Sequence, residues 1–152
     1  MIDIGTYVLV IDLRVQLRLQ IGKLGIHNLQ PGHYIYVGSA LGGLSSRLKR
    51  HLRSKKKLHW HIDYLLRQAD VAQIWYTIGQ DRLECKWNTV VQSLPRAMPS
   101  IPRFGASDCR CSSHLTYFQA TPCYSLFKKN LKRNKLLKIQ RHNDFNSSFN
   151  TV

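Results

Sequence analysis

The segment from Thr6 to Ile11, TYVLVI, restricts the fold more than any other, because it is almost continuously apolar and rich in β-branched residues. Such a run predicts a strand that is buried on both faces. The next segment, VQLRLQI (15–21), alternates apolar and polar residues, which is typical of a half-exposed antiparallel strand. After the turn-rich GIHNLQPG, the segment HYIYVG (33–38) predicts a third strand. The short connections between these three segments favour an antiparallel meander.

A glycine-rich turn then leads into a helix, with Ser45 or Ser46 available near its N-cap. In this helix Leu44, Leu48 and Leu52 recur at helical spacing and are expected to face the sheet. The apolar patterns further along predict a helix over 61–69, a strand over 71–78, a helix over about 82–94 and a last strand over 115–118.

The chain is strongly basic, with 23 Lys and Arg against 8 Asp and Glu, a net charge of +15 and a pI near 10.1. A small domain with this charge is expected to have an anionic partner, and we expect nucleic acid rather than a membrane. No stretch is long and apolar enough to cross a bilayer, and the N-terminus lacks the pattern of a signal peptide. We therefore expect a cytoplasmic protein with reduced cysteines, nucleoid-associated if it is bacterial or archaeal.

The composition changes near residue 120, which divides the chain into a domain over 1–120 and a basic C-terminal tail over 121–152. The tail is expected to be partly helical or disordered and to add non-specific affinity for phosphates.

The predicted helix after the glycine-rich turn carries many cations and no acid. Arg47 and His51 stand four residues apart beside the leucine stripe, so we expect them at the margin of a cleft against the sheet. For any single cation here a solvated position is the simpler interpretation, but the segment as a whole favours contact with phosphates. The cations predicted to bind nucleic acid, of which the first three are expected to point to solvent, are Lys49, Arg50, Arg53, Lys55, Lys56 and Lys57.

Glu84 is one of only eight acids, and it lies in the first turn of the third predicted helix. With Asp81 it has the spacing of a capping box, so helix capping and metal binding are equally compatible with the sequence. If Glu84 is a metal ligand, a lone carboxylate suits Mg²⁺, which keeps most of its water ligands.

Cysteine and histidine residues at short spacing also suggest a zinc site. The spacing of Cys109-x-Cys111 does not match the C-x₂₋₄-C of common zinc sites. Hydrogen bonding and packing are therefore preferred, and Zn²⁺ is not expected. The residues concerned are His59, His61, Cys109, Cys111 and His114.

Several of these features together resemble the GIY-YIG nuclease superfamily: Gly5-Thr6-Tyr7, Tyr36-Val37-Gly38, Arg47 and Glu84. The resemblance is closer to an uncharacterised GIY-YIG-like domain family that occurs alone or fused to the DNA-repair enzyme endonuclease III. It covers roughly residues 4–118 and rests on several strings in order. These are IGKLG, PGxYxYVGSAxGGLxxRxxRH, HWHIDYLL, ECxWN and RFGASDCxCxSHL.

The resemblance implies a small α+β domain, with a central three-stranded antiparallel sheet flanked by helices and an extra strand or hairpin between the two motifs. It also implies an endonuclease that hydrolyses phosphodiester bonds, with DNA as the expected substrate and Mg²⁺ or Mn²⁺, held by Glu84, as the cofactor. Tyr7 and Tyr36 would orient or deprotonate the attacking water, which as bases requires a pKa well below about 10. Arg47 would stabilise the developing charge, and His51 would assist proton transfer or contact the phosphate.

A second hypothesis is a non-catalytic nucleic-acid-binding module that keeps the scaffold and the basic surface. Joint retention of Tyr7, Tyr36, Arg47 and Glu84 favours the enzyme over this module. The extra strand between the two tyrosines leaves open whether they meet.

Overall fold

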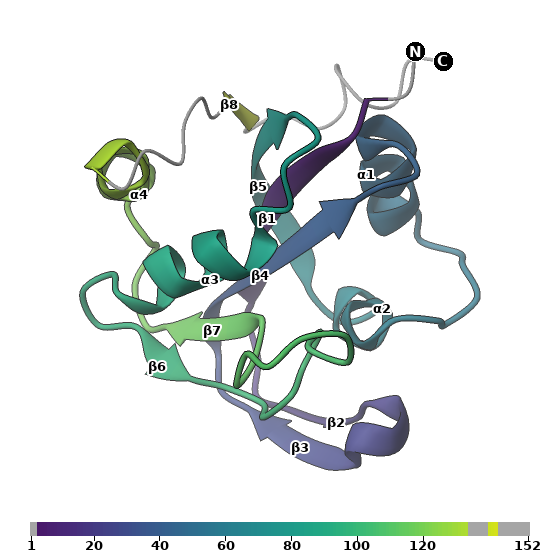
Figure 1. Cartoon of the computed structure of the whole chain (residues 1–152). Helices are drawn as coiled ribbons and strands as arrows, with labels where there is room; N and C mark the ends of the chain where they lie inside the picture. Colours follow the sequence, from purple (N-terminus) through teal and green to yellow (C-terminus); the bar gives the residue numbers. More distant parts are fainter. Residues whose placement is uncertain (1–2, 134–139, 143–152) are drawn as a thin grey trace.

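The computed structural model describes residues 3–133 and 140–142, which form an α+β fold (Figure 1). Its elements follow one another as β1 (Gly5–Leu13), β2 (Leu17–Gln20), the 3₁₀ helix η1 (Gly22–Leu24), β3 (Ile26–Leu29), β4 (Gly32–Ala40), α1 (Leu44–Leu52), α2 (His61–Leu66), β5 (Asp70–Ile78), α3 (Glu84–Gln92), β6 (Met98–Pro99), β7 (Leu115–Phe118), α4 (Tyr124–Arg133) and β8 (Gln140–His142).

The main sheet has the strand order β6-β7-β4-β1-β5-β8, and all of its pairings are antiparallel. β1 lies between β4 and β5, which like β1 are nine residues long. Its side chains are buried on both faces, as the TYVLVI segment predicts. An α+β fold with an antiparallel sheet is thus confirmed, but the sheet has six described strands rather than the three expected, with β4, β1 and β5 adjacent within it.

The predicted meander through VQLRLQI is wrong, because β2 does not join the main sheet. It pairs with β3 in a separate two-stranded sheet, and β3 occupies part of the segment predicted as a turn. β1 pairs along nearly its whole length with the long strands β4 and β5, whereas β2 is short and exposes every second residue. The predicted extra hairpin between the two motifs is confirmed as this β2–β3 unit, which lies apart from the central strands (Figure 1).

The helices cover the two faces of the sheet in pairs. α1 and α2 pack on one face, where Leu44 and Leu48 join a core with Leu9 and Ile11 of β1. α3 and α4 pack on the other face, around Trp87. Figure 1 shows α1 and α2 on the opposite side of β1 and β4 from α3 and α4. The leucine stripe of α1 therefore faces the sheet as predicted.

The start of α1 differs from the sequence prediction. α1 begins at Leu44 after Gly43, and neither Ser45 nor Ser46 caps it with its side chain. Instead the carboxylate of Asp3 accepts hydrogen bonds from the Ser45 N–H and hydroxyl at 3.0 and 2.6 Å. A carboxylate that is remote in the sequence thus takes the place of the local cap, and its negative charge interacts favourably with the positive end of the helix dipole.

α4 lies within the segment predicted as a basic tail. Its Phe127 and Leu131 are fully buried in the core that contains Trp75 and Trp87, so this part of the segment packs on the sheet. The prediction of disorder for the last residues falls on positions outside the described part of the chain. Among the described residues, no helix is both long and apolar enough to cross a membrane.

The contact between Gly38 and Tyr7 gives a first prediction. A Cβ atom added at Gly38 would lie 2.6 Å from the Tyr7 ring, in a buried position between two strands. We expect Gly38→Ala to lower the free energy of unfolding by about 1–3 kcal/mol, as overpacking in a closed core does. Urea unfolding measures this. Gly42→Ala is the matched control, because a Cβ there meets no atom within 4 Å, and an equal loss in both variants would contradict the contact.

Candidate active site

A pocket of about 380 Å³ lies where β4 passes beyond its pairing with β7. β7 pairs with β4 only from His33 to Tyr36, after which the Val37 N–H donates to the carbonyl of His114. The pocket walls come from β4, α1, the start of α2, the start of α3 and the loop before β7. Among the residues that line it are Tyr36, Ser39, Arg47, Trp60, His61, Glu84, Gly105, Asp108 and Cys109.

The two motif tyrosines meet, with their ring centroids 6.3 Å apart. In the β1–β4 register Tyr7 is opposite Gly38 and Tyr36 is opposite Leu9, so the two rings belong to the same sheet face. Gly38 leaves the space that the Tyr7 ring occupies. The hairpin between the motifs does not separate the tyrosines, because it forms a sheet of its own.

Behind Tyr36, Tyr7 forms a buried pair with His51. The Tyr7 hydroxyl lies 2.7 Å from His51 Nε2, and only 1% of Tyr7 and 3% of His51 are exposed. Burial, with the nearby charges of Lys56 and Arg47, lowers the pKa of His51 to about 3. His51 is therefore neutral near pH 7, and its Nδ1 has no hydrogen-bond partner among the described residues.

The pKa values of Tyr7 and Tyr36 do not favour a role for either tyrosine as a base. Burial raises the pKa of Tyr7 to about 12, although the charge of Arg47 opposes this. Burial and the neighbouring Tyr7 raise the pKa of Tyr36 well above its usual value. The predicted deprotonation of water by these tyrosines needs a pKa shift in the other direction, and it does not fit this geometry. Both hydroxyls keep their protons and can donate hydrogen bonds.

Arg47 is held in the pocket by two contacts. Its Nη1 donates to the carbonyl of Ser39 at 3.0 Å, and its guanidinium lies 4.3 Å from the ring centroid of Trp60. In the part of the chain that the structure describes, no carboxylate lies within ion-pair distance of Arg47. The side chain is thus fixed while its charge stays unmatched, which suits an anionic ligand.

Arg50 was expected to point to solvent, and this is wrong. It forms two hydrogen bonds, of 2.8 and 2.9 Å, with the fully buried Asp63, and its guanidinium also lies over the Trp60 ring, 4.2 Å from the centroid. Although burial acts in the opposite direction, the Arg50 hydrogen bond helps to lower the pKa of Asp63 to about 2. The charge of Arg50 is therefore used within the fold.

The other cations predicted to bind nucleic acid divide in the same way. Lys56 donates to the carbonyls of Arg50 and His51 at 3.1 and 2.6 Å, where it covers the end of α1. Arg53, Lys55 and Lys57 are exposed, and Lys49 is half-buried. Two of the six predicted cations, Arg50 and Lys56, are thus bound within the fold, which leaves Lys49, Arg53, Lys55 and Lys57.

Glu84 lies in the pocket wall as the first residue of α3. The N-cap position is Leu83, and no side chain caps this helix start. Of the two alternatives that the sequence left open for Glu84, a capping box with Asp81 is therefore not formed. Glu84 is half-buried and lines the same pocket as Tyr36 and Arg47.

The prediction of Mg²⁺ or Mn²⁺ as the cofactor, with Zn²⁺ not expected, is wrong. Within the described residues, the side chains that gather as possible metal ligands are Cys85, Cys109, Cys111 and His114, whose ligand atoms all lie within 4.8 Å of one another. Thiolate and imidazole ligands suit zinc, whereas magnesium and manganese prefer oxygen ligands. Burial, together with the neighbouring Cys111 and Cys109, raises the pKa of the Cys85 thiol to about 12.

The sequence alone suggested His59 and His61 as partners of Cys109, Cys111 and His114, and it did not group Cys85 with them. His61 Nδ1 instead accepts the Gly105 N–H at 2.9 Å, and the exposed His59 packs its ring against Trp60. Cys85 lies far upstream of Cys109 in the sequence, so no local spacing connects them. The sequence did indicate Cys85 in one way: this residue adjoins Glu84 in ECxWN, one of the strings on which the family resemblance rests.

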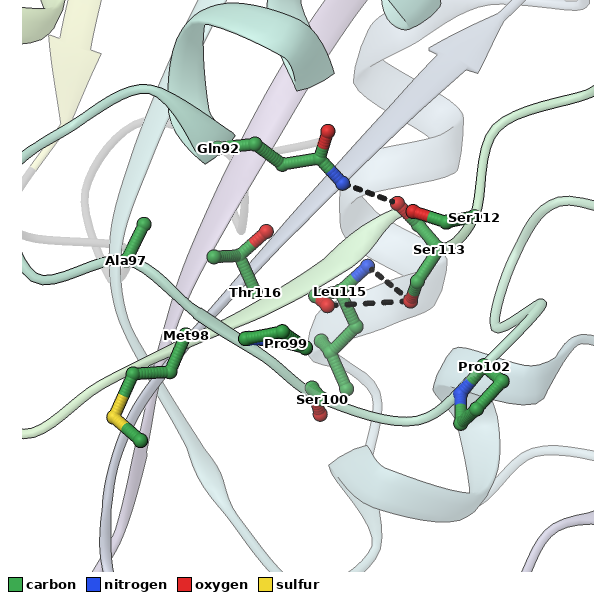
Figure 2. A pocket seen from close by; sticks show the side chains of 10 residues that line it. All are labelled: Gln92, Ala97, Met98, Pro99, Ser100, Pro102, Ser112, Ser113, Leu115 and Thr116. Carbon is green, nitrogen blue, oxygen red and sulfur yellow. Dashed lines mark hydrogen bonds between the residues drawn. The ribbon is translucent and has the colours of Figure 1, made fainter.

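A second hollow lies on the other side of the loop before β7, and Figure 2 shows its lining. It is predominantly apolar, with Met98 and Pro99 of the edge strand β6 on one side. Gln92 of α3 donates to the carbonyl of Ser113 at 3.3 Å across it (Figure 2). This hollow holds no cluster of charged or metal-binding side chains, so the polar pocket is the candidate active site.

The comparisons with known proteins give a family without a known activity. Residues 6–136 match the family described as "Domain of unknown function DUF123". No curated protein and no solved structure matches the chain.

The buried, neutral His51 predicts a pH dependence of stability. Its pKa is lower in the folded chain than the unfolded value of 6.5, so its contribution to stability is complete above pH 6.5 and declines as the pH falls towards 3. We expect the free energy of unfolding to fall by about 2 kcal/mol between pH 7 and pH 5 because of this residue. Asp63, with a pKa lowered to about 2, acts at lower pH.

Urea unfolding of the chain and of His51→Gln at both pH values measures this contribution. The variant should lose less stability than the wild type on acidification, while His59→Gln, at an exposed position, should behave as the wild type does. A pH dependence that is unchanged in His51→Gln would contradict the neutral buried imidazole.

Proposed function

The chain belongs to the family described as "Domain of unknown function DUF123", and we propose that it is a nucleic-acid phosphodiesterase that acts at the pocket of Tyr36, Arg47 and Glu84. DNA is the expected substrate, in line with the resemblance to the GIY-YIG nucleases. The observation that carries the proposal is that one polar pocket contains a fixed, unmatched guanidinium, a phenol and a carboxylate.

Arg47 supplies the contact with the scissile phosphate. A guanidinium offers two parallel N–H groups to phosphate oxygens, and its charge opposes the negative charge that grows in the transition state. The Ser39 carbonyl and the Trp60 ring already hold the Arg47 side chain, so little side-chain entropy is lost when the phosphate binds. Arg50, three residues on, cannot take this role while it is bound to Asp63.

Hydrolysis requires a water oxygen to attack phosphorus as the bond to the leaving sugar oxygen breaks. In this proposal Glu84, a carboxylate of the pocket wall, orients this water and accepts its proton. Tyr36 keeps its phenol proton, and it donates a hydrogen bond to the phosphate rather than acting as a base. In this scheme the released sugar oxygen takes up a proton from solvent.

Tyr7 and His51 act from behind the pocket. Neither lines it, and both are buried, but the Tyr7 ring packs against Tyr36, and the Tyr7 hydroxyl is bonded to His51. They are therefore positioning residues that hold the Tyr36 ring on the sheet face. The resemblance implies that Tyr7 and His51 act directly on the water or the phosphate. Their burial instead favours the role of positioning Tyr36.

The nucleic acid would follow the outer side of α1 and the turn after it. Lys49, Arg53, Lys55 and Lys57 remain for its phosphates, because Arg50 and Lys56 are bound within the fold. Counterion release from the nucleic acid makes such contacts favourable and sensitive to salt.

A specific observation also favours a non-catalytic nucleic-acid-binding module. The raised pKa values of both phenols and the burial of the Tyr7–His51 pair are what packed aromatic residues in a core would show. Such a module would use Arg47 and the lysines for phosphate contact alone, and Glu84 would have no role in it.

Cleavage and binding measured side by side separate the two functions. We expect the chain to cleave labelled plasmid, branched or single-stranded DNA when assayed over a panel of divalent cations. Arg47→Ala and Glu84→Gln should each lower the cleavage rate by about 100-fold or more, because each removes a group that acts on the transition state. Binding, followed by fluorescence anisotropy, should change only a few-fold in Glu84→Gln.

Arg18→Ala is the matched control, because Arg18 is exposed on the β2–β3 hairpin and its loss changes the net charge by the same amount as Arg47→Ala. If the wild type binds DNA in a salt-dependent way but cleaves none of these substrates, the phosphodiesterase proposal fails and the binding module remains. Equal effects of Arg18→Ala and Arg47→Ala would show that the pocket is not the site.

A further inference from the structure

Three thiols and one imidazole meet beside the pocket, although they come from two distant parts of the chain. Cys85 lies in the first turn of α3, and Cys109, Cys111 and His114 lie in the loop that leads into β7. Their ligand atoms are mutually within 4.8 Å, and the fourth cysteine, Cys123, is exposed outside the group.

The distances in this cluster suit a tetrahedral ion. His114 Nε2 lies 3.2 Å from Cys109 Sγ and 3.8 Å from Cys85 Sγ. Zinc bonds of about 2.3 Å to sulfur and about 2.0–2.1 Å to nitrogen place neighbouring ligands of a tetrahedron about 3.5–3.8 Å apart. Only small side-chain movements would therefore centre an ion between the four atoms.

The backbone orients His114 for binding through Nε2. Its Nδ1 lies 3.1 Å from the carbonyl of Val37, and because a carbonyl only accepts, Nδ1 must carry the proton. This leaves the lone pair of Nε2 directed at the thiols. His114 is fully buried, so the ring is held in place, as ring partners hold metal-bound histidines in known sites.

The loop that carries the cysteines is organised independently of any ion. The Arg103 guanidinium donates to the carbonyls of Ala106, Cys109 and Cys111. On the α3 side, Asn88 donates to the carbonyl of Ser113 at 2.8 Å, and Gln92 reaches the same carbonyl (Figure 2). One face of α3 is thereby tied to the end of the loop, with Cys85 at its start.

We propose that Cys85, Cys109, Cys111 and His114 bind one Zn²⁺ in a closed structural site that fastens the start of α3 to the loop before β7. Four protein ligands leave no position open for water or substrate, which is the arrangement of structural rather than catalytic zinc. Because Glu84 adjoins Cys85, and Cys109 itself lines the pocket, the ion fixes one wall of the candidate active site. The zinc site does not depend on the proposed phosphodiesterase activity.

Metal analysis of the full chain, purified without chelator, tests the proposal. We expect about one zinc ion per chain and, after exchange into cobalt, the visible absorption of tetrahedral Co²⁺ with a thiolate-to-cobalt charge-transfer band. Cys85→Ser and Cys111→Ser should lose most of the bound zinc. Cys111→His should retain it, because it replaces one zinc ligand with another, and Cys123→Ser should match the wild type.

Thermal unfolding gives a second measurement that does not depend on whether a variant folds well. A chelator should lower the Tm of the wild type and of Cys123→Ser, and zinc added back should restore it. Zinc content in the wild type no higher than in Cys85→Ser would overturn the proposal, as would a disulfide among Cys85, Cys109 and Cys111 found by mass spectrometry. A cobalt spectrum without thiolate charge transfer would overturn it as well.

Discussion

The close pairing of β1 with β4 is the constraint on which the rest of the site depends. Tyr7 can lie opposite Gly38 only because that residue has no side chain, and the Tyr7 ring fills the space. From there its hydroxyl reaches His51 of α1, which ties the helix to the sheet through a buried polar contact as well as through leucines. A side chain at position 38 would displace Tyr7, and with it the packing of Tyr36 and the position of α1 relative to β4.

The cations of α1 show how one helix can carry both structural and functional charges. Arg50 pairs with a buried carboxylate, and Lys56 donates to terminal carbonyls of the helix, so both side chains are engaged inside the fold. An isolated buried Asp63 would be costly, and Arg50 compensates it. The guanidinium groups of both Arg47 and Arg50 lie over the ring of Trp60, at 4.3 and 4.2 Å from its centroid. Arg47 is left oriented towards the pocket with its charge unmatched among the described carboxylates.

Local patterns in the sequence predicted the elements well where burial alone decides structure. TYVLVI, the leucines of α1 and the LTYF of β7 lie where their periodicity indicated. The sequence could not show what a tertiary partner decides. VQLRLQI has the alternation of a strand, but the alternation does not specify which strand it pairs with. Arg47 and Arg50 differ because Asp63, which binds Arg50, comes from α2. The cap expected from Ser45 or Ser46 at the start of α1 is replaced by the carboxylate of Asp3. Cys85 joins Cys109 only because α3 folds back against the loop.

The two walls of the pocket are stabilised by different physical means. The α1 wall rests on Leu44 and Leu48, which are fully buried, and on the Arg50–Asp63 pair. The opposite wall is the loop before β7, in which only Ile101, Phe104 and Ala106 are buried apolar residues before Ser113. Ordering each loop residue costs about 1–2 kcal/mol, which so little burial cannot offset. Directional bonds therefore help to hold the loop: Arg103 bonds to its carbonyls, and in our proposal a zinc ion bound by the cysteines adds to these bonds. If the cysteine cluster binds zinc as proposed, this wall of the pocket takes its shape from the cluster as well as from the sheet.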